Sequence, residues 1–270
     1  MVHPAALAAA SLRARLGDAI PDMIEAVVSR LGESAEHDPD PRRLLNAIVS
    51  DPVDEDLVAQ LSGALGWVLP RRVAVIVLEV GVVPGDLPPG TLADWTSPEP
   101  VLVLPDPDAP GRAAAIGRAL RGCRAAIGLA VPLAQAPHSL RWAREALALA
   151  RAGVFGEGVG PVRCQEHMST LLLLADKDLA SAMVRPRLAP LDRLRPGQRE
   201  LIAATLLAWL ELSMNTVAVA RRMNVHPQTI RYRLKRIRQL FGDELGDPQR
   251  RFELMLALRI AVLFSLTTDG

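Results

Sequence analysis

A short run of basic residues near the C-terminus has the composition needed to bind a polyanion. Residues 227–240 contain no acidic side chain and five bases, which are Arg231, Arg233, Lys235, Arg236 and Arg238. Apolar residues recur every three or four positions, at Ile230, Leu234, Ile237 and Phe241. This spacing predicts one helix whose apolar stripe faces inward. Its opposite face carries Gln228, Tyr232, Lys235, Arg236 and Gln239. A helix with such a cationic, hydrogen-bonding face suits the major groove of DNA.

The residues just before this helix predict a second helix and a tight turn, so that residues 215–240 form a helix-turn-helix. Ala220 is small where the two helices would cross, and Asn224 tolerates the left-handed backbone that such a turn needs. Pro227 suits the first turn of the second helix. The alternative is an ordinary amphipathic helix with a solvated basic face. The preceding helix and turn favour DNA binding over that alternative.

The candidate DNA contacts follow from the way a helix-turn-helix docks, because the N-terminal part of its second helix reaches the base edges. The candidates for base readout lie in the first turns: Gln228, Thr229 and Tyr232. Three cations further on are candidates for guanine or phosphate contacts: Arg233, Lys235 and Arg236. Arg231 and Arg238 lie on the flanks, where we expect them to neutralise phosphates and fix register. His226 is either the N-cap of this helix or a phosphate contact.

The charge of the chain is unevenly distributed, although its net charge is only +1. Residues 199–264 carry 11 basic and 6 acidic side chains, whereas the remainder carries 20 basic and 24 acidic ones. A positive end on a mildly acidic body is the electrostatic pattern of a nucleic-acid-binding module. Half of the 270 residues are hydrophobic and 23% are charged. This is an ordinary globular composition, with enough chain for one large or two smaller domains.

The sequence favours a cytoplasmic protein that does not bind membranes. Its two cysteines, Cys123 and Cys164, give no reason to expect a disulfide framework. No cationic segment precedes the alanine-rich N-terminal stretch, so we expect no secretory signal. The longest apolar runs are far shorter than the ~20 residues that a membrane span needs.

Upstream of the basic helix, strands alternate with helices, which predicts an α/β or α+β sandwich. Residues 73–78 are apolar on both faces and therefore predict a buried strand. Residues 81–100 contain five prolines and three glycines and are expected to be mostly irregular. Further strands are predicted at 101–104 and 125–131, and further helices at 110–122 and 138–152. Residues 153–161 are predicted to form a loop.

The remaining segments are predicted to be helical. Before the first strand we expect helices within residues 4–31 and a helical pair at 44–49 and 54–65. Asp54 is the expected N-cap of the second helix in this pair, and Gly66 its C-terminal cap. The other expected segments are short helices at 167–174 and 179–184, a proline-punctuated linker at 185–196, and longer helices at 198–212 and 248–266. The last helix has too many apolar residues for one narrow stripe, so we expect it to pack against both its own domain and a partner.

Two segments near the C-terminus, VHPQTIRYRLKRI and GDELGDPQRRFELMLALRIA, resemble the helix-turn-helix of the PucR/CdaR family of bacterial transcriptional regulators. Two earlier segments, LVAQLSGALGWVLPRRVAVIVLEV and AAIGLAVPLAQAPHSLRWAREALALAR, are similar to the start and end of the degenerate GGDEF-like domain of that family. The resemblance covers about residues 43–264. It implies a dimeric or higher-order regulator that binds double-stranded DNA, often an activator of catabolic or stress genes.

The resemblance implies an α+β fold with three structural parts joined by a linker. The expected divisions are an N-terminal helical region at 1–66, a ferredoxin-like, degenerate GGDEF-like α/β domain at 67–165, a helical linker at 166–197 and an all-α helix-turn-helix domain at 198–266. The sequence departs from the family after the first strand, where a proline-rich segment replaces a helix. It also contains no Gly-Gly pair, so the loop with which a diguanylate cyclase binds nucleotide is missing.

Three hypotheses for the middle domain stay open at this point. An enzyme of nucleotide metabolism is disfavoured by the missing Gly-Gly loop. The domain could instead bind a small-molecule effector, or serve only as a dimerisation or partner-binding scaffold. No catalytic residue, cofactor or metal ion is predicted. Residues 156–160 resemble a dinucleotide loop, but they follow a helix and run into Pro161. The five histidines and two cysteines lack the spacing of metal ligands.

Overall fold

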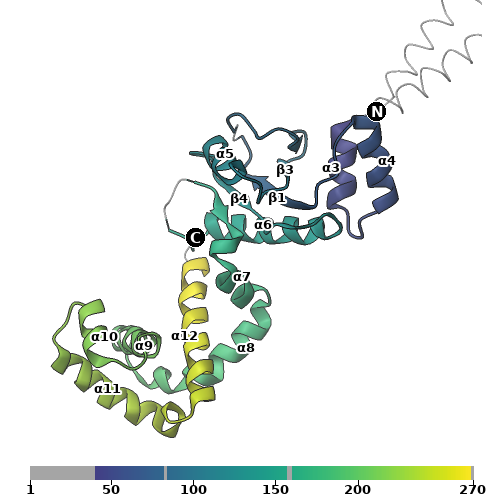
Figure 1. Cartoon of the computed structure of the whole chain (residues 1–270). Helices are drawn as coiled ribbons and strands as arrows, with labels where there is room; N and C mark the ends of the chain where they lie inside the picture. Colours follow the sequence, from purple (N-terminus) through teal and green to yellow (C-terminus); the bar gives the residue numbers. More distant parts are fainter. Residues whose placement is uncertain (1–39, 82–83, 157–159, 269–270) are drawn as a thin grey trace, which may run out of the picture.

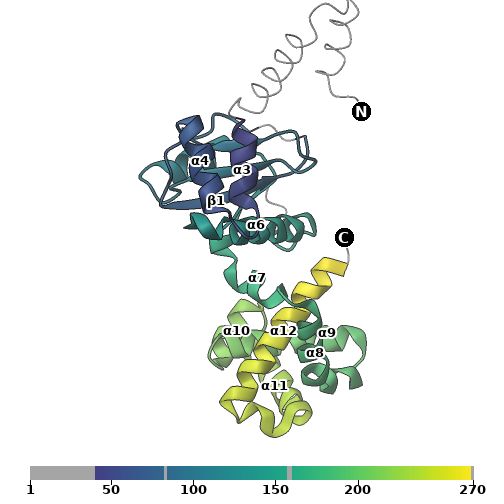
Figure 2. The ribbon, with the colours of Figure 1, turned by 90° about the vertical axis from the view of Figure 1, so that its right-hand side faces the viewer.

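The computed structural model describes residues 40–81, 84–156 and 160–268, and the helices expected within residues 4–31 lie outside these ranges. Figures 1 and 2 show two bodies, one containing a sheet and one entirely helical. Helices α7 (Met168–Leu174) and α8 (Lys177–Leu188) lead from the first body to the second. Helix α12 (Pro248–Thr268) runs back toward the first body, beside α8. In the described part of the chain, no helix is both long and apolar enough to cross a bilayer.

The sheet has the strand order of a ferredoxin-like domain with one strand added at its edge. Its strands are β1 (Arg72–Leu78), β2 (Leu92–Asp94), β3 (Val101–Pro105), β4 (Ala125–Ile127), β5 (Val131–Pro132) and β6 (Val162–Arg163). The order is β2-β3-β1-β4-β6; the first three pairings are antiparallel, whereas β4 and β6 are parallel. Helix α5 (Arg112–Ala119) makes the crossover from β3 to β4. The described residues between β1 and β2 form no helix, as expected from their prolines. The predicted α+β class is confirmed.

The central strand β1 is buried on both faces, which confirms the prediction for residues 73–78. Its odd-numbered valines, Val73, Val75 and Val77, share a core with α3 (Pro41–Val49), α4 (Glu55–Leu65) and α6 (Ala136–Arg151). Its even-numbered residues, Ala74, Ile76 and Leu78, pack in a second core with α5. Asp54 caps α4 as predicted, and Gly66 takes the predicted left-handed conformation with φ 63°. Because α3 and α4 contribute to the first core, they help to form the sheet-containing body.

The prediction of one strand over residues 125–131 is wrong, because β4 and β5 are separate. Ile76 pairs with Ile127 but Val73 pairs with Val131, so three residues of one strand face two of β1. Such an extra residue is a β-bulge. Ser139 of α6 satisfies the backbone groups that this bulge exposes. Its Oγ accepts a hydrogen bond from the Val75 N–H at 3.0 Å and donates one to the Leu129 carbonyl at 2.8 Å.

Other boundaries also differ from the predictions. Residues 81–100, expected to be mostly irregular, contain β2, which pairs with β3. Strand β6 (Val162–Arg163) was not predicted. Helix α5 is shorter than predicted because it begins only after Gly111, whose φ is 78°. The expected linker at 185–196 begins inside α8, which extends past Pro186 to Leu188. Packing against α12, with an ion pair between Arg187 and Glu253, offsets the backbone hydrogen bond that the proline removes.

The helical body has a core of its own. Helices α9 (Pro196–Glu211), α10 (Thr216–Arg222), α11 (Pro227–Phe241) and α12 contribute buried side chains to it, among them Leu206, Val219, Leu234 and Leu254. Further along α12, Leu263 and Phe264 pack against the core of the sheet-containing body. One continuous helix therefore contacts both cores; the packing against its own domain was predicted, and the contact with the sheet-containing body was not.

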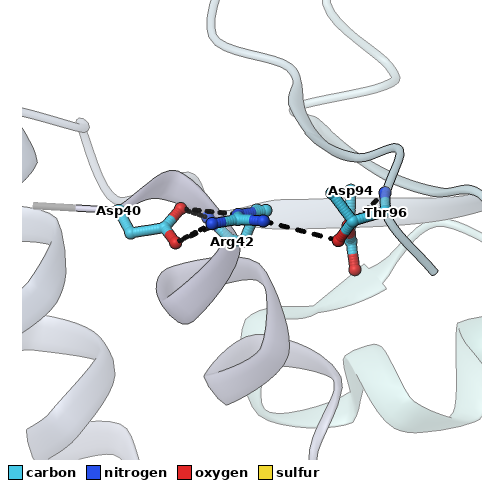
Figure 3. A network of polar contacts seen from close by, with 4 residues as sticks. All are labelled: Asp40, Arg42, Asp94 and Thr96. Carbon is cyan, nitrogen blue, oxygen red and sulfur yellow. Dashed lines mark hydrogen bonds and ion pairs between the residues drawn. The ribbon is translucent and has the colours of Figure 1, made fainter. Parts of the chain in front are cut away.

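A chain of polar contacts joins the start of α3 to the end of β2 (Figure 3). Asp40 caps α3 and pairs with Arg42 at 2.8 Å. A guanidinium nitrogen of Arg42 donates to Thr96 Oγ1 at 3.5 Å. Asp94 then accepts hydrogen bonds from the Thr96 backbone N–H at 2.9 Å and from its hydroxyl at 2.7 Å. These bonds from Thr96 hold the pKa of the Asp94 carboxyl below its usual value of 3.8.

We expect the Asp94 carboxylate to make the fold sensitive to acid. A carboxyl whose pKa is lower in the native state stabilises that state above the unfolded pKa of 3.8, and this stabilisation disappears as pH falls through the native pKa. Asp94→Asn should therefore lower the urea midpoint at about pH 6, and the difference should vanish well below pH 4. Thr96→Val, which removes one of the two donors, should show part of the effect. A pH-independent difference between wild type and Asp94→Asn would contradict this explanation.

Candidate nucleic-acid interface

The apolar stripe of α11 is buried as its spacing predicted. Ile230 and Ile237 are fully buried, and Leu234 and Phe241 are nearly so. Their packing in one core with buried side chains of α9, α10 and α12 fixes the rotation of α11 about its axis. The opposite face is consequently the one that remains in contact with solvent.

The turn between α10 and α11 has the predicted helix-turn-helix geometry. Asn215 caps α10, since its Oδ1 accepts from the N–H groups of Val217 at 3.0 Å and Ala218 at 3.1 Å. Ala220 is buried where the helices meet, and Asn224 has a left-handed φ of 51°. Pro227 is the first residue of α11. The backbone therefore reverses within residues 223–226 without a glycine.

His226 is the N-cap of α11, which is one of the two roles predicted for it. Its Nδ1 accepts a hydrogen bond from the Gln228 N–H at 3.2 Å, so this nitrogen carries no proton in the contact. The cap satisfies one of the backbone donors that every helix leaves unpaired at its start. The exposed imidazole lies beside the first turn, next to the side chains predicted to read bases.

The candidate contact residues occupy three zones around α11. The central zone, which lies opposite the buried stripe, consists of Gln228, Tyr232 and Lys235, all exposed. The Tyr232 side chain is 76% exposed. Thr229, Arg233 and Arg236 form the flank beside α9, where Arg233 donates to Thr205; the three line one hollow together with α9 residues, Tyr232 and Lys235. Arg231 lies on the other flank, where its guanidinium donates to Gln228 Oε1 at 3.2 Å.

Arg233 differs from the other cations of α11. It is only partly exposed, and one guanidinium nitrogen donates to Thr205 Oγ1 of α9 at 3.2 Å. Thr205 is fully buried and its hydroxyl donates to the Leu201 carbonyl at 2.7 Å. The sequence predicted Arg233 as a guanine or phosphate contact; the structure gives it a fixed position between two helices.

A partly buried carboxylate that sequence reasoning missed joins the helices of the helix-turn-helix. Glu211, at the end of α9, pairs with Arg222 of α10 at 2.6 Å and with Arg259 of α12 at 2.9 Å. No local sequence signal identifies Glu211, because its partners are 11 and 48 residues away. Asn215 was also missed, although a capping residue before an apolar helical run is a known start signal.

The cysteines, the possible metal ligands and the glycine-containing segment were the other candidate sites, and in the described residues they show less organised chemistry than the helix-turn-helix. Burial raises the pKa of the Cys164 thiol to about 12, so this thiol stays protonated near neutral pH. It lies 3.4 Å from the Trp142 carbonyl, to which it can donate. Among the described residues, no group of three or more His, Cys, Asp and Glu side chains is arranged to hold a metal ion. The glycine-containing segment at 156–160 lies partly outside the described residues.

Comparison with known proteins places this geometry in a sequence family. The PucR C-terminal helix-turn-helix domain matches residues 202–260. An uncharacterized protein of Mycobacterium tuberculosis is 32% identical over 138 residues, covering 51% of this chain and 32% of that protein. The purine catabolism regulatory protein of Bacillus subtilis is 39% identical over 61 residues, covering 23% of this chain and 12% of the regulator. The carbohydrate diacid regulator of Escherichia coli is 30% identical over 100 residues, covering 36% of this chain and 26% of that regulator.

These matches differ in how much of each protein they include. The matched part spans about a third of the length of the mycobacterial relative and less of the two regulators. The family match, by contrast, covers most of α9, all of α10 and α11 and the first half of α12. It includes both the capped turn and the basic outward face. The chain therefore carries a PucR-type C-terminal helix-turn-helix domain.

Proposed function

We propose that this protein is a sequence-specific transcriptional regulator that binds double-stranded DNA with α11 in the major groove. The observation that carries the proposal is the basic, outward face of α11 on a helix-turn-helix of the PucR type. Two relatives of the chain are named as regulators, one of purine catabolism and one of carbohydrate diacids. The diameter of an α-helix, about 10–12 Å, matches the roughly 12 Å width of the major groove.

The proposal predicts specific binding with a steep dependence on salt. Fluorescence anisotropy would compare a duplex from the promoter of the protein's own operon with a scrambled duplex of equal length. Specific regulators typically bind their sites at least about a thousandfold more tightly than other DNA at physiological salt. Each phosphate contact adds about −0.9 to the slope of log affinity against log salt. Weak and equal binding to both duplexes would remove the claim of sequence specificity.

Variants of α11 should separate base readers from phosphate anchors. Thr229→Ala or Tyr232→Ala should relax the preference for particular base pairs, with a loss of about 1–3 kcal/mol on the preferred site. Arg231→Gln is the matched control on the same helix; it should weaken binding to all sequences alike and reduce the salt slope by about 0.9. Binding of each variant to a set of single-base-pair substitutions would test this. Uniform losses for Thr229→Ala and Tyr232→Ala would instead place those side chains on phosphates.

We also propose that the regulator acts as a homodimer. Helix-turn-helix proteins commonly read two half-sites related by a two-fold axis. Helix α12 supports this, because Val262 and Leu266 remain about half exposed on the helical body. Sedimentation equilibrium should give twice the 29.1 kDa chain mass, and Val262→Glu should shift the equilibrium toward the monomer. Arg250→Glu, an exposed position near the start of the same helix, serves as the control for added charge. A monomeric wild type at micromolar concentration would overturn the proposal.

The two hydrophobic cores support proposed boundaries for two domains with different functions. We place the DNA-binding domain at about residues 188–262, where the second core lies. Helices α3 and α4 share a core with the sheet, so we extend the α/β domain to about residue 40. We propose that this domain is a scaffold or an effector-binding unit. A thermal-shift screen with purines and carbohydrate diacids, the compound classes in the relatives' names, would distinguish the two.

A further inference from the structure

A hollow of about 620 Å³ lies between the first half of α9 and the outward face of α11. One wall is formed by Gln198 and Leu201 of α9, and the other by side chains of α11. The α11 side chains that line it are Thr229, Tyr232, Arg233, Lys235, Arg236 and Gln239. None of the lining residues is acidic. The hollow therefore joins the basic face of α11 to an uncharged wall on α9, a helix that the proposed readout does not use.

The three cations of this hollow lack carboxylate partners in the described part of the chain. No ion pair there involves Arg233, Lys235 or Arg236. Two other arginines of the same body are in ion pairs: Arg199 pairs with Asp192 at 2.9 Å, and Arg222 pairs with Glu211. Unpaired cations around a cavity without acids suit an anion, because a phosphate would supply the missing negative charge.

Arg233 is held in place at the side of the hollow nearest to α9. The Thr205 hydroxyl accepts a hydrogen bond from Arg233, which joins α11 to α9, and donates its own hydrogen to the Leu201 carbonyl within α9. A guanidinium has five N–H donors, and this contact uses one of its nitrogens. The remaining donors are available to an anion without a further change in the position of the side chain.

We infer that the hollow seats a phosphate of one DNA strand, with Arg233 and Arg236 of α11 on one side and Gln198 of α9 on the other. The inference rests on the proposed DNA binding by α11. A helix that fills the major groove brings its two flanks close to the two backbones. Arg231 and Arg238 lie on the flank away from α9, and they face the second backbone in this arrangement. Helix α9 thus becomes part of the DNA-binding surface and sets the register of the recognition helix.

The test uses the full chain and two unrelated duplexes, since phosphate contacts do not depend on sequence. Arg236→Gln should weaken binding equally on both and reduce the salt slope by about 0.9. When the salt concentration rises fourfold, both proteins lose affinity, and the factor by which wild type loses affinity should be about 3.5 times the factor for Arg236→Gln. Gln198→Glu places a negative charge against the phosphate and should also weaken binding equally on both. Arg199→Gln is the matched control. It also removes one positive charge from α9, at the residue next to Gln198, but Arg199 pairs with Asp192, so the salt slope should stay close to that of wild type.

The outcomes separate this inference from the function on which it rests. If wild type binds no duplex even at low salt, the proposed function fails. If wild type binds with a steep salt dependence but Gln198→Glu binds as tightly, α9 does not contact DNA and the inference alone fails. The inference also fails if Arg199→Gln lowers the slope as much as Arg236→Gln does. A loss by Gln198→Glu on one duplex only would mean a base contact instead of a phosphate. The substituted residues are all exposed, so the variants should unfold at the same temperature as wild type, which thermal unfolding followed by circular dichroism would check.

Discussion

Gly128→Ala is expected to destabilise the α/β domain by about 3 kcal/mol or more. A Cβ built at this position would lie 2.3 Å from both the backbone oxygen and the hydroxyl oxygen of Ser139. The clash with the backbone oxygen cannot be relieved by rotating a side chain, so α6 would have to move away from the sheet. That movement would also stretch the hydrogen bonds of Ser139 to Val75 and Leu129 across the bulge. Buried backbone groups left unpaired cost about 1–3 kcal/mol each.

Gly63→Ala is the matched control for this prediction. Gly63 lies in α4 of the same domain, and a Cβ there would meet nothing within 4 Å. Because glycine lowers helix stability, the control should be unchanged or more stable by roughly 0.5–1 kcal/mol. Urea unfolding followed by circular dichroism would compare both variants with wild type. An unchanged midpoint for Gly128→Ala would show that α6 does not pack against Gly128 as closely as the structure indicates.

The contrast between these two glycines shows which features can be predicted from sequence. The special role of Gly128 depends on Ser139, which approaches it from another element, and no pattern around residue 128 reports that approach. The strand prediction for 125–131 failed for the same reason: the bulge is set by pairing with β1 and by a hydroxyl from α6. Strand β2 was missed because its pairing with β3 lies in a proline-rich segment.

The helix-turn-helix was predictable because its determinants are local. The spacing of Ile230 and Leu234 sets the buried face of α11, and Asn224 and Pro227 set the turn within a few residues. The fixed position of Arg233 was not predictable, since it depends on Thr205 in another helix. Sequence thus indicates which face of α11 meets DNA, whereas tertiary contacts decide how each cation on that face is held. This difference matters most at the end of α9, where one acid orders three helices.

Glu211→Ala is expected to destabilise the DNA-binding domain by about 2 kcal/mol and to weaken DNA binding. The Glu211 side chain is 15% exposed, whereas its partners Arg222 and Arg259 are about half exposed. The expected loss therefore lies between that of a surface ion pair, about 0–1 kcal/mol, and that of a buried one, about 3–5 kcal/mol. Glu211 ties α10 and α12 to the end of α9, so its removal should loosen the position of α10 beneath α11.

The sign of the effect on DNA binding distinguishes this positioning role from simple electrostatics. Removing any acid makes the domain more positive, which by itself favours DNA. Glu200→Ala provides that control, because Glu200 is exposed on the same helix; its affinity for DNA should stay equal or rise slightly. Glu211→Ala should instead bind DNA more weakly than wild type. Glu211→Gln keeps the shape of the side chain but not its charge, and its affinity for DNA should lie between those of Glu211→Ala and wild type. If Glu211→Ala binds DNA as tightly as Glu200→Ala at a temperature where both are folded, Glu211 contributes charge and stability but does not position the helix-turn-helix.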